Sequence, residues 1–351
     1  MKPPSISDVA KAAGLSRSAV SRSFTPGASV ASATRARVIE VAERLGYQPN
    51  LLARSLSRSR SRTIGIAVAR LDNPFNAELL QQLARGIGEA GYGIRLFVAQ
   101  DGDEPDPGIA GIIQHRVDAL VTCAIGLSSS LRRDCAALGI PVVMVNRRTQ
   151  EGGTCVVSDN RTGGAEVARF LIACGHRRFA FIGGERDAST SRDRETGFAG
   201  ALAEAGLTPP IAVTADWRPE RAAALTRDLL ARDDHPDALF YANDHMAFVG
   251  MAVAEHELGL VPGRDLSIVG YDDVSYAKLG RGLTTFTQVI ADMADHAVAA
   301  ALSLIDGRTL PQRQVVAGRL IVRGSSAVPD QGCRTVEGVR TWSSGIAGPV
   351  T

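Results

Sequence analysis

The chain has 351 residues, 45% of them hydrophobic and 22% charged, a composition typical of a globular protein with more than one domain. It has no apolar run of about 18 residues and no signal-peptide core, so we expect a cytoplasmic protein with no membrane partner. The five scattered cysteines form no CxxC pair, which predicts neither a disulfide framework nor a metal site. Charge is uneven: residues 1–63 hold 11 Lys and Arg against 3 Asp and Glu, a net of +8, whereas the remainder has a net of −6. A basic segment on a mildly acidic body indicates a polyanionic partner, and we predict double-stranded DNA.

A small all-α helix-turn-helix unit is predicted at the N-terminus. Ser5 and Asp8 have the spacing of a capping box that starts a first helix, and Gly14 permits the positive φ of a sharp turn. Ser16 can then cap a second helix over residues 17–24. The outward polar face of this second helix would enter the major groove, where arginine donates to guanine and serine contacts bases or phosphate. The candidate DNA-contacting residues of the unit are Ser5, Ser16, Arg17, Ser18, Ser21 and Arg22.

A third helix is expected from Ser32 to Leu45, with Gly46 as its C-terminal stop. A generic three-helix unit with a solvated basic face is the alternative interpretation. The segments DVAKAAGLS, AVSR, TRARVIEVAERLGYQPN and LARSL, however, closely resemble the DNA-binding head of the lactose-repressor (LacI/GalR) family of bacterial transcription regulators. This resemblance continues through most of the chain, to residue 328.

The resemblance implies a hinge between the head and the body. In the family, the segment matching Asn50 to Arg58 folds into a short helix only when it is paired with its dimer mate on DNA. The residue matching Leu56 is wedged into the minor groove, beside the residue matching Ala53. Such a wedge unstacks bases and bends the DNA onto more protein surface. A structural role for Leu56, anchoring a linker to the body, is the alternative.

Two positions before the third helix depart from the family pattern. Thr25 stands where the family usually has Asn, and Ala31 stands where it has a capping Ser. We expect Ser32 to take over the cap, which would shift the start of the helix by one residue.

From residue 63 onward, apolar segments that end in polar residues alternate with amphipathic segments. This alternation predicts parallel sheets with helices on both faces, in which a ligand binds beyond the carboxyl ends of the strands. The resemblance implies two such lobes joined by three crossovers around a cleft, as in a periplasmic sugar-binding protein. The predicted strand segments are IGIAVARL, IRLFVA, DALVTCA, PVVMVN, RRFAFIGG, DALFYAND and LSIVGYDD, and later helices are expected over 162–174, 195–206, 219–232 and 245–259.

The predicted domain organisation combines the head, the hinge and an effector-binding and dimerisation body. The tail is rich in Gly, Ser and Thr, so we expect it to be disordered. It lacks the leucine heptad with which some family members form tetramers, so a homodimer is expected. The boundaries are 1–49 for the head, 50–62 for the hinge, 63–329 for the body and 330–351 for the tail, with an N-lobe over 63–160 plus 290–320 and a C-lobe over 161–289 plus 321–329.

The effector contacts are predicted by matching this chain to the family, with Arg192 added as a second candidate cation. An aromatic ring can stack on the CH face of a sugar, and Asn, Asp and Arg can share hydroxyls or a carboxylate. The candidate effector residues are Phe75, Asn76 and Asn146 in the N-lobe, and Thr190, Arg192, Arg194, Trp217, Asn243 and Asp272 in the C-lobe.

Simpler roles are open for several of these residues. Asn243 and Asp272 could cap the following turn or helix, Arg194 could pair with Glu195 in solvent, and Trp217 could be plain core. The family commonly has Asp at the position of Asn146, so a polyol preference cannot be carried over from relatives.

The expected function is a ligand-responsive, sequence-specific transcription regulator, most simply a repressor of a catabolic or uptake operon. It would bind a palindromic operator as a homodimer, associated with the nucleoid, and a sugar or sugar acid in the cleft. A transport-type solute receptor is the alternative, and the basic head opposes it. An enzyme is disfavoured because the sequence has no GxSxG, HExxH or P-loop motif, and no cofactor is expected.

Overall fold

The computed structural model describes residues 4–24, 28–47, 60–98, 116–148 and 152–345. The chain divides into two compact units, Met1–Ser61 and Arg62–Thr351. No helix within the described ranges has both the length and the apolar character needed to cross a membrane.

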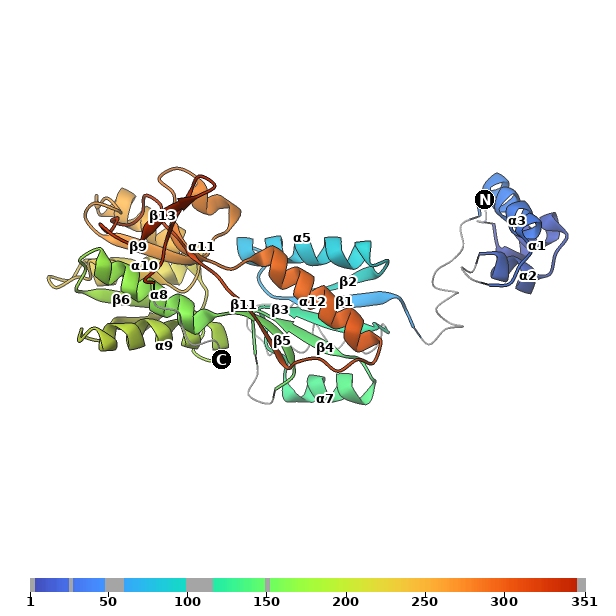
Figure 1. The fold of residues 1–351 in the computed structure, drawn as a ribbon, viewed down its shortest axis with the longest axis horizontal. Coiled ribbons are helices and arrows are strands. Elements are labelled where there is room, and N and C mark those ends of the chain that lie inside the picture. The colour runs from blue at the N-terminus through green and yellow to red at the C-terminus, as the bar shows by residue number, and fades with distance from the viewer. Residues whose placement is uncertain (1–3, 25–27, 48–59, 99–115, 149–151, 346–351) are drawn as a thin grey trace. The chain divides into compact units, whose positions relative to one another are not determined.

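The first unit contains the three predicted helices (Figure 1): α1 (Ile6–Ala13), α2 (Arg17–Ser23) and α3 (Ser32–Leu45). Leu45, the last residue of α3, is exposed, and Tyr47 packs on the core beyond the end of this helix, with its ring 5.9 Å from that of Phe24. The small core consists of Val9, Ala10, Ala13, Val20, Val38, Val41 and Ala42.

Local hydrogen bonds fix the ends of these helices. The carboxylate of Asp8 accepts from both the backbone N–H (2.8 Å) and the hydroxyl (2.7 Å) of Ser5, which stabilises the start of α1. Gly14 follows α1 with a φ of 68°, as the sharp turn requires. The prediction that Ser32 caps α3 was wrong, because α3 begins at Ser32 with Ala31 in the cap position.

Arg35 connects the start of α3 to the preceding segment. Its guanidinium donates to the carbonyl oxygens of Ser23 and Ala28, each at 3.0 Å. Because Ala31 has no side chain that can cap α3, these two hydrogen bonds from Arg35 hold the segment before the helix in place.

The second unit contains two sheets, and the first of them is entirely parallel, with the strand order β11-β5-β4-β3-β1-β2. Its apolar clusters place α5 (Pro74–Glu89) and α12 (Ile290–Ile305) on one face and α7 (Ser129–Ala137) on the other. Its strands are β1 (Thr63–Val68), β2 (Gly93–Val98), β3 (Ala119–Cys123), β4 (Val142–Val145), β5 (Thr154–Ser158) and β11 (Arg313–Val316).

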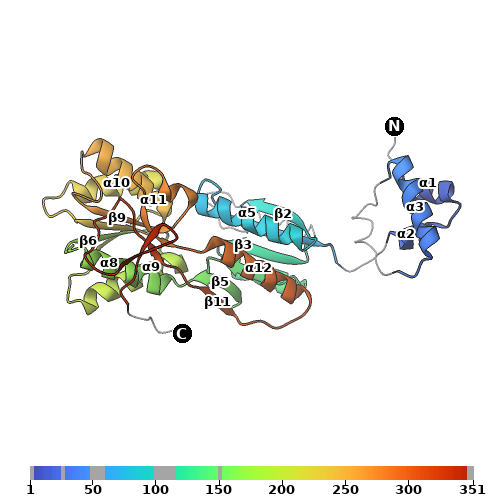
Figure 2. The same ribbon diagram turned by 45° about the horizontal axis from the view of Figure 1, so that its top comes forward.

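The second sheet has the order β13-β14-β12-β10-β9-β8-β6-β7 and is parallel from β10 to β7. Helices α8 and α9 lie on one side of it, and α10 and α11 on the other (Figures 1 and 2). Its elements are β6 (Phe179–Gly183), β7 (Ile211–Thr214), β8 (Ala238–Tyr241), β9 (Ser267–Asp272), β10 (Thr284–Thr287), β12 (Leu320–Ile321), β13 (Cys333–Val336), β14 (Val339–Trp342), α8 (Asn160–Ala173), α9 (Ser189–Glu204), α10 (Pro219–Leu230), α11 (Asp244–Ala252), the π-helical turn η1 (Val253–Glu257) and the 3-10 turn η2 (Ser275–Lys278).

The two sheets define an N-lobe and a C-lobe, and the chain passes between them after β5, after β10 and after β11. These passages agree with the three expected crossovers. Backbone and side-chain contacts join the strand ends of the lobes: the N–H of Ser275 donates to Glu78 of α5 at 2.9 Å. The fold is therefore the predicted two-lobed α/β body with parallel sheets.

The expectation of a disordered tail from residue 330 was wrong for the segment that forms β13 and β14. These strands pair through a two-residue turn at Glu337 and Gly338, whose φ angles of 52° and 78° suit a tight hairpin. Trp342 is buried against Phe170 of α8, with ring centroids 5.6 Å apart. The hairpin also pairs with β12 and so extends the second sheet. A buried tryptophan and a strong turn outweigh the polar composition of this segment.

Candidate functional site

The second helix of the head presents a polar surface. The Ser16 hydroxyl accepts the N–H of Ala19 at 3.2 Å, which fixes the start of α2. Val20 and Ser23 face inward, and the Ser23 hydroxyl donates to the Ala19 carbonyl at 2.9 Å, so this inward polar group is satisfied. The predicted DNA-contacting side chains within the described residues are all exposed: Ser5, Ser16, Arg17, Ser18, Ser21 and Arg22.

This arrangement suits a helix that enters the major groove. The apolar side of α2 packs on the core, and its outward arginine and serine side chains are exposed, as contacts with base edges or phosphates require. The predicted hinge residues Asn50, Ala53 and Leu56 lie outside the described residues.

In the body, the predicted effector residues lie at the carboxyl ends of strands or in the helices that follow them. Arg192 is exposed and Trp217 is half-buried. The buried members are Phe75, Asn76, Asn146, Thr190, Arg194, Asn243 and Asp272. Six of these seven side chains are polar, and polar side chains are rarely buried to this extent without a hydrogen-bond partner or a function.

Buried polar atoms without a hydrogen-bond partner gather on these same residues. Such atoms are costly in a folded protein, and a bound ligand can supply the missing partners. On the predicted residues and on Gln288, these atoms are Asn76 Oδ1, Asn146 Oδ1, Arg194 Nη2, Trp217 Nε1, Asn243 Nδ2 and Gln288 Oε1.

Arg194 is held rigidly although its side chain is buried. Its Nε donates to Asn160 Oδ1 at 2.8 Å, Nη1 donates to the carbonyl of Ala242, and the guanidinium lies over the ring of Tyr271 at 3.6 Å from the centroid. The solvated pair with Glu195 that we considered for Arg194 is therefore not formed. Nη2 remains available to a ligand.

Close packing of α8 on α9 positions Arg194. A Cβ atom at Gly164 would lie 2.1 Å from the carbonyl oxygen of Arg194, and one at Gly197 would lie 1.9 Å from that of Arg161. Only glycine fits at both places, because any side chain would separate the helices. The spacing between α8 and α9 thus sets the depth at which the guanidinium enters the site.

Asp272 lies beside Arg194, with 3.9 Å between its Oδ1 and Nη1. Oδ1 of Asp272 accepts a hydrogen bond from Gln288 Nε2 at 2.6 Å. Burial raises the pKa of Asp272 well above its ordinary value, although the guanidinium of Arg194 acts in the opposite direction. Asp272 accordingly orients Gln288, and Val274, not Asp272, occupies the N-cap position of the following 3-10 turn.

Asp244 forms a second buried carboxyl group behind the site. It accepts from the Thr285 hydroxyl at 2.6 Å and from the N–H of Val274 at 3.0 Å. Desolvation nevertheless raises the pKa of Asp244 to about 7. Its two hydrogen bonds join α11 to β10 and to the segment after β9.

Asn243 caps α11 and keeps one amide atom available. Its Oδ1 accepts the N–H of Met246 at 2.9 Å, which is the capping role considered from the sequence. Its Nδ2 has no partner among the described residues. The capping bond fixes which amide atom is free, so Asn243 offers a donor.

Trp217 rests on the backbone at the end of β6. Its indole would lie 2.0 Å from a Cβ atom at Gly184, so the ring packs flat against this glycine. The ring also contacts the edge of the C-lobe core, as considered from the sequence, but its buried Nε1 is unpaired. Trp217 is therefore both a packing residue and a candidate donor.

On the N-lobe side, the amide of Asn76 is oriented by two carbonyl groups. Its Nδ2 donates to the carbonyls of Ala69 at 2.9 Å and Arg70 at 3.1 Å, which leaves Oδ1 as a free acceptor. Asn146 follows β4 with a positive φ of 57°. Phe75, the residue before Asn76, packs in the N-lobe core.

Arginines after β4 connect the lobes. Arg147 donates through Nη2 to Glu185 at 3.2 Å and through Nε to the Ala124 carbonyl at 3.0 Å. Arg148 Nη2 lies 2.6 Å from both carboxylate oxygens of Asp193 in α9. Burial lowers the pKa of Arg147.

Gln288 was not predicted, although it lies in the same hydrogen-bonded group. It follows β10, a strand that we did not recognise because its sequence, TTFT, is short and has only one apolar residue. A polar residue directly after a strand was the available signal.

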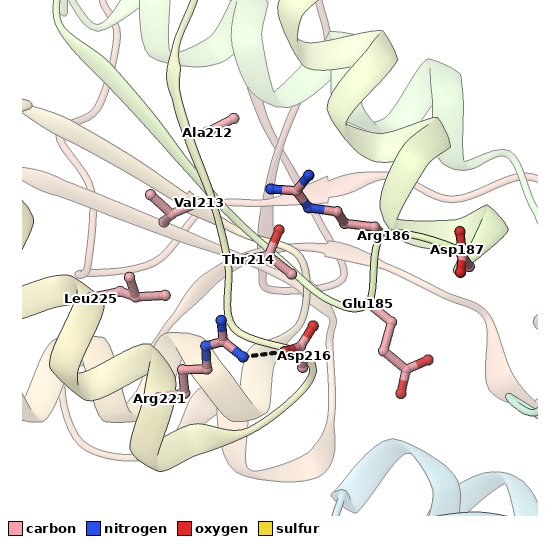
Figure 3. A pocket seen from close by; sticks show the side chains of 9 residues that line it. All are labelled: Glu185, Arg186, Asp187, Ala212, Val213, Thr214, Asp216, Arg221 and Leu225. Carbon is pink, nitrogen blue, oxygen red and sulfur yellow. Dashed lines mark hydrogen bonds and ion pairs between the residues drawn. The ribbon is translucent and has the colours of Figure 1, made fainter. Parts of the chain in front are cut away.

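An open pocket of about 660 Å³ lies next to this group, at the end of β6 and along the edge strand β7 (Figure 3). Its charged side chains include Arg221, which pairs with Asp216. None of the predicted effector residues lines this pocket. The described residues contain no cluster of three or more His, Cys, Asp or Glu suited to a metal ion.

A helix-turn-helix head joined to a two-lobed body of this kind defines a DNA-binding regulator with a ligand site. The model of bacterial regulatory proteins of the lacI family matches residues 5–50, and the periplasmic binding protein-like domain matches residues 168–326. The ribose operon repressor of Escherichia coli K12 is 31% identical over 91% of this chain and 98% of its own length. The chain belongs to the lacI family.

Solved structures show the same fold over nearly the whole chain. The lac repressor dimer bound to operator and the anti-inducer ONPF has a TM-score of 0.85 at 25% identity, covering 93% of this chain and 100% of its own. The complex of the transcriptional regulator CelR with cellobiose has a TM-score of 0.70 at 28% identity, covering 92% of this chain and 100% of its own.

Proposed function

We propose that this protein is a ligand-responsive transcriptional repressor of a catabolic or uptake operon. It binds a palindromic operator as a homodimer, and a small effector in the cleft changes its affinity for DNA. The observation that carries this proposal is the group of unpaired buried atoms at the strand ends of a chain that also has an exposed basic recognition helix.

Each half of the proposal has its own support. The recognition helix exposes Arg17 and Arg22, and residues 1–63 carry a net charge of +8 that attracts the DNA backbone. Of the relatives, one is named a ribose operon repressor and another was solved with cellobiose, which supports a sugar-like effector.

An apolar strand edge supports the dimer. β2 is the outermost strand of the N-lobe sheet, and Ile94, Leu96 and Val98 on one side of it are exposed. Three large apolar side chains at alternate positions of an edge strand form an association surface. A second copy of the chain that covers this edge would bury them.

The domain boundaries follow from this function. We propose a head over 1–49, a hinge over 50–62 and an effector-binding body that begins at residue 63. In this proposal Asn50 of the hinge contacts DNA, and Leu56, with Ala53 beside it, is wedged into the minor groove. We also propose a location in the cytoplasm on the nucleoid, and no catalytic activity.

The coupling between the two sites works through the hinge. Closure of the lobes around an effector would move the start of β1, and so the distance between the two hinges of a dimer. Because this is a coupling free energy, operator DNA must change effector affinity by the same factor as the effector changes operator affinity.

Fluorescence anisotropy with labelled duplexes tests the proposal. A palindromic site selected from random sequence should bind far more tightly than unrelated duplex, and the affinity should fall steeply as salt rises. A chain that ignores duplex DNA at low salt would instead be a transport-type solute receptor, the alternative that the body alone allows.

A further inference from the structure

Two cysteines that are far apart in the sequence are brought together where the C-terminal hairpin packs on α8. Cys174 follows the last residue of α8, and Cys333 is the first residue of β13. All five cysteines are free thiols, and Cys123, Cys135 and Cys155 are buried. Cys174 and Cys333 are partly exposed, so a reagent in solvent can reach them.

The register of the hairpin sets the direction of the Cys333 side chain. Cys333 lies directly opposite Trp342 in the pairing of β13 with β14, and residues opposite each other in an antiparallel pair project from the same face. Trp342 is buried against Phe170 of α8, with ring centroids 5.6 Å apart. The face of the hairpin that carries Cys333 is therefore the face that packs on α8.

On α8, Cys174 lies one helical turn beyond Phe170. Residues four positions apart share a face of a helix, so Cys174 is on the face that receives the hairpin. Its Sγ is 3.3 Å from the carbonyl oxygen of Ala327, in the segment that leads to the hairpin. Both cysteines also pack on the same apolar cluster, which includes Phe170 and Trp342. The two thiols are therefore neighbours, and Cys333 accordingly contributes to raising the pKa of Cys174.

This pair of thiols lies in a part of the chain outside the matched domains. The match to the periplasmic binding protein-like domain ends at residue 326, before Cys333. Noncovalent contacts hold the hairpin to α8: the ring of Trp342 on Phe170, and the hydrogen bond from the Ser344 N–H to Glu166 at 3.1 Å. A bond between the two sulfurs would add a covalent link to the same pair of elements.

The two thiols differ in how readily they ionise. Burial raises the pKa of Cys174 to about 12, so this group is a protonated thiol at neutral pH. Burial also raises the pKa of Cys333, but Arg340 acts in the opposite direction. Arg340 is two residues from Trp342, so it lies diagonal to Cys333 on the same face of the hairpin. Because the thiolate is the nucleophile, Cys333 is the sulfur that attacks an oxidant first.

We propose that Cys174 and Cys333 form a disulfide when the protein meets a peroxide. The Cys333 thiolate attacks hydrogen peroxide, takes one oxygen atom as a sulfenic acid and releases hydroxide. The Cys174 sulfur then attacks the Cys333 sulfur, the S–OH bond breaks, and the departing hydroxide leaves as water with the proton of the Cys174 thiol. The two thiols lose two electrons and two protons, and the peroxide is reduced to two molecules of water.

This disulfide acts as a reversible clasp on the hairpin. Cytoplasmic proteins are kept reduced, and the disulfides that do form in them are mostly transient and sense oxidants. Peroxide therefore fixes β13 to the end of α8, and a thiol reductant releases it.

Peptide mapping of the full-length chain, before and after treatment with excess hydrogen peroxide, tests this inference. We expect the oxidised monomer to yield one cross-linked pair of peptides that contains Cys174 and Cys333, and dithiothreitol should separate them. The melting temperature of the oxidised chain should rise by about 5 °C, because the cross-link restricts the unfolded chain.

Substitutions identify the sulfurs. Cys174→Ser and Cys333→Ser should each lose both the cross-link and the peroxide-dependent rise in melting temperature. Cys135→Ala is the matched control, since Cys135 is buried in α7 of the N-lobe, and this variant should retain both.

Other products would overturn the proposal. A sulfinic acid at Cys333 without a cross-link would show that the sulfurs do not reach each other. A link between two chains, or between other cysteines, would contradict the pairing, as would five free thiols after prolonged exposure to peroxide and then to oxidised glutathione. Should a serine variant not fold, the peptide map of the unaltered chain decides. Operator binding by the untreated protein tests the repressor function separately.

Discussion

The head and the cleft recognise their partners with opposite physical strategies. The head exposes arginine and serine side chains. Its core is small, and all of its residues lie between Ile6 and Tyr47, a stretch of 42 positions. The cleft instead buries its polar atoms, and residues from Asn76 to Gln288 contribute to it. The first strategy suits a large polyanion approached through water, and the second suits a small molecule that is withdrawn from water.

This difference predicts which substitutions matter most. Exposed charges contribute little individually and are screened by salt, whereas unpaired buried donors and acceptors make a large contribution once a ligand satisfies them. Changes to the buried groups of the body should therefore affect its stability or its affinity for the effector, and changes to the exposed side chains of α2 should affect DNA binding.

The largest effect is expected from Gly197→Ala. The new methyl group would lie 1.9 Å from the carbonyl oxygen of Arg161, so α9 must move away from α8. We expect a loss of about 3 kcal/mol in the free energy of unfolding, measured in urea. Gly200→Ala in the same helix is the control, because nothing lies within 4 Å of its new methyl group. Equal stability of the two variants would refute tight α8–α9 packing.

A smaller and more selective effect is expected from Arg17→Ala. Loss of a two-hydrogen-bond contact to guanine should relax base preference at one operator position by about 1–3 kcal/mol. The measurement is binding to a set of operators with single substitutions. Arg44→Ala in α3 removes the same charge and should leave that preference unchanged. Uniform weakening across all sequences would make Arg17 a phosphate contact instead.

The pH dependence of stability should reveal the carboxyl group behind the cleft. The pKa of Asp244 is raised from 3.8 to about 7, so the folded protein retains a proton that the unfolded chain has lost between these values. This group's contribution to stability is therefore largest below pH 3.8 and declines as pH rises to about 7.

Asp244→Asn should flatten this part of the profile of melting temperature against pH. The raised pKa of Asp272 acts in the same direction, so some decline should persist. Asp234→Asn is the control. Arg232 lowers the pKa of this exposed carboxyl, so replacing Asp234 cannot remove a decline of the melting temperature toward neutral pH. An unchanged profile in Asp244→Asn would argue against a buried titrating group at this position.

The smallest effect is expected from Arg148→Gln, which breaks the contact with Asp193 between the lobes. The two side chains are 40% and 22% exposed, so the pair contributes at most about 1 kcal/mol, or about fivefold in effector affinity at low salt. Arg85→Gln breaks a pair inside α5 and should not change effector affinity. A change of a hundredfold would make Arg148 a direct ligand contact.

The head could be predicted from sequence almost completely because its signals are local. The Ser5–Asp8 capping box, Gly14 and the Ser16 cap each act within four residues, and all are present. The cap of α3 was the exception, because Arg35 closes that turn through contacts with residues distant along the chain.

The body could be predicted as a fold but only partly as a site. Long apolar strands such as β6 and β9 were recognisable, whereas β10 is too short and polar to identify, and Gln288 after it was missed. The start of α9 was expected at residue 195 but lies at Ser189, where α9 packs on α8. Pairing between distant segments decided these features, and one sequence does not reveal such pairing.

The hairpin of β13 and β14 changes where this protein can be shortened. The Ser344 N–H donates to Glu166 of α8 at 3.1 Å and Trp342 packs on Phe170 of the same helix, so the segment is attached to the C-lobe by a hydrogen bond and by a buried ring. A chain that stops at residue 329 would leave β12 as a bare edge and uncover Phe170. The exposed edge of such a chain could pair with the same edge of another molecule. A fragment of the body that does not aggregate should therefore extend at least to residue 345.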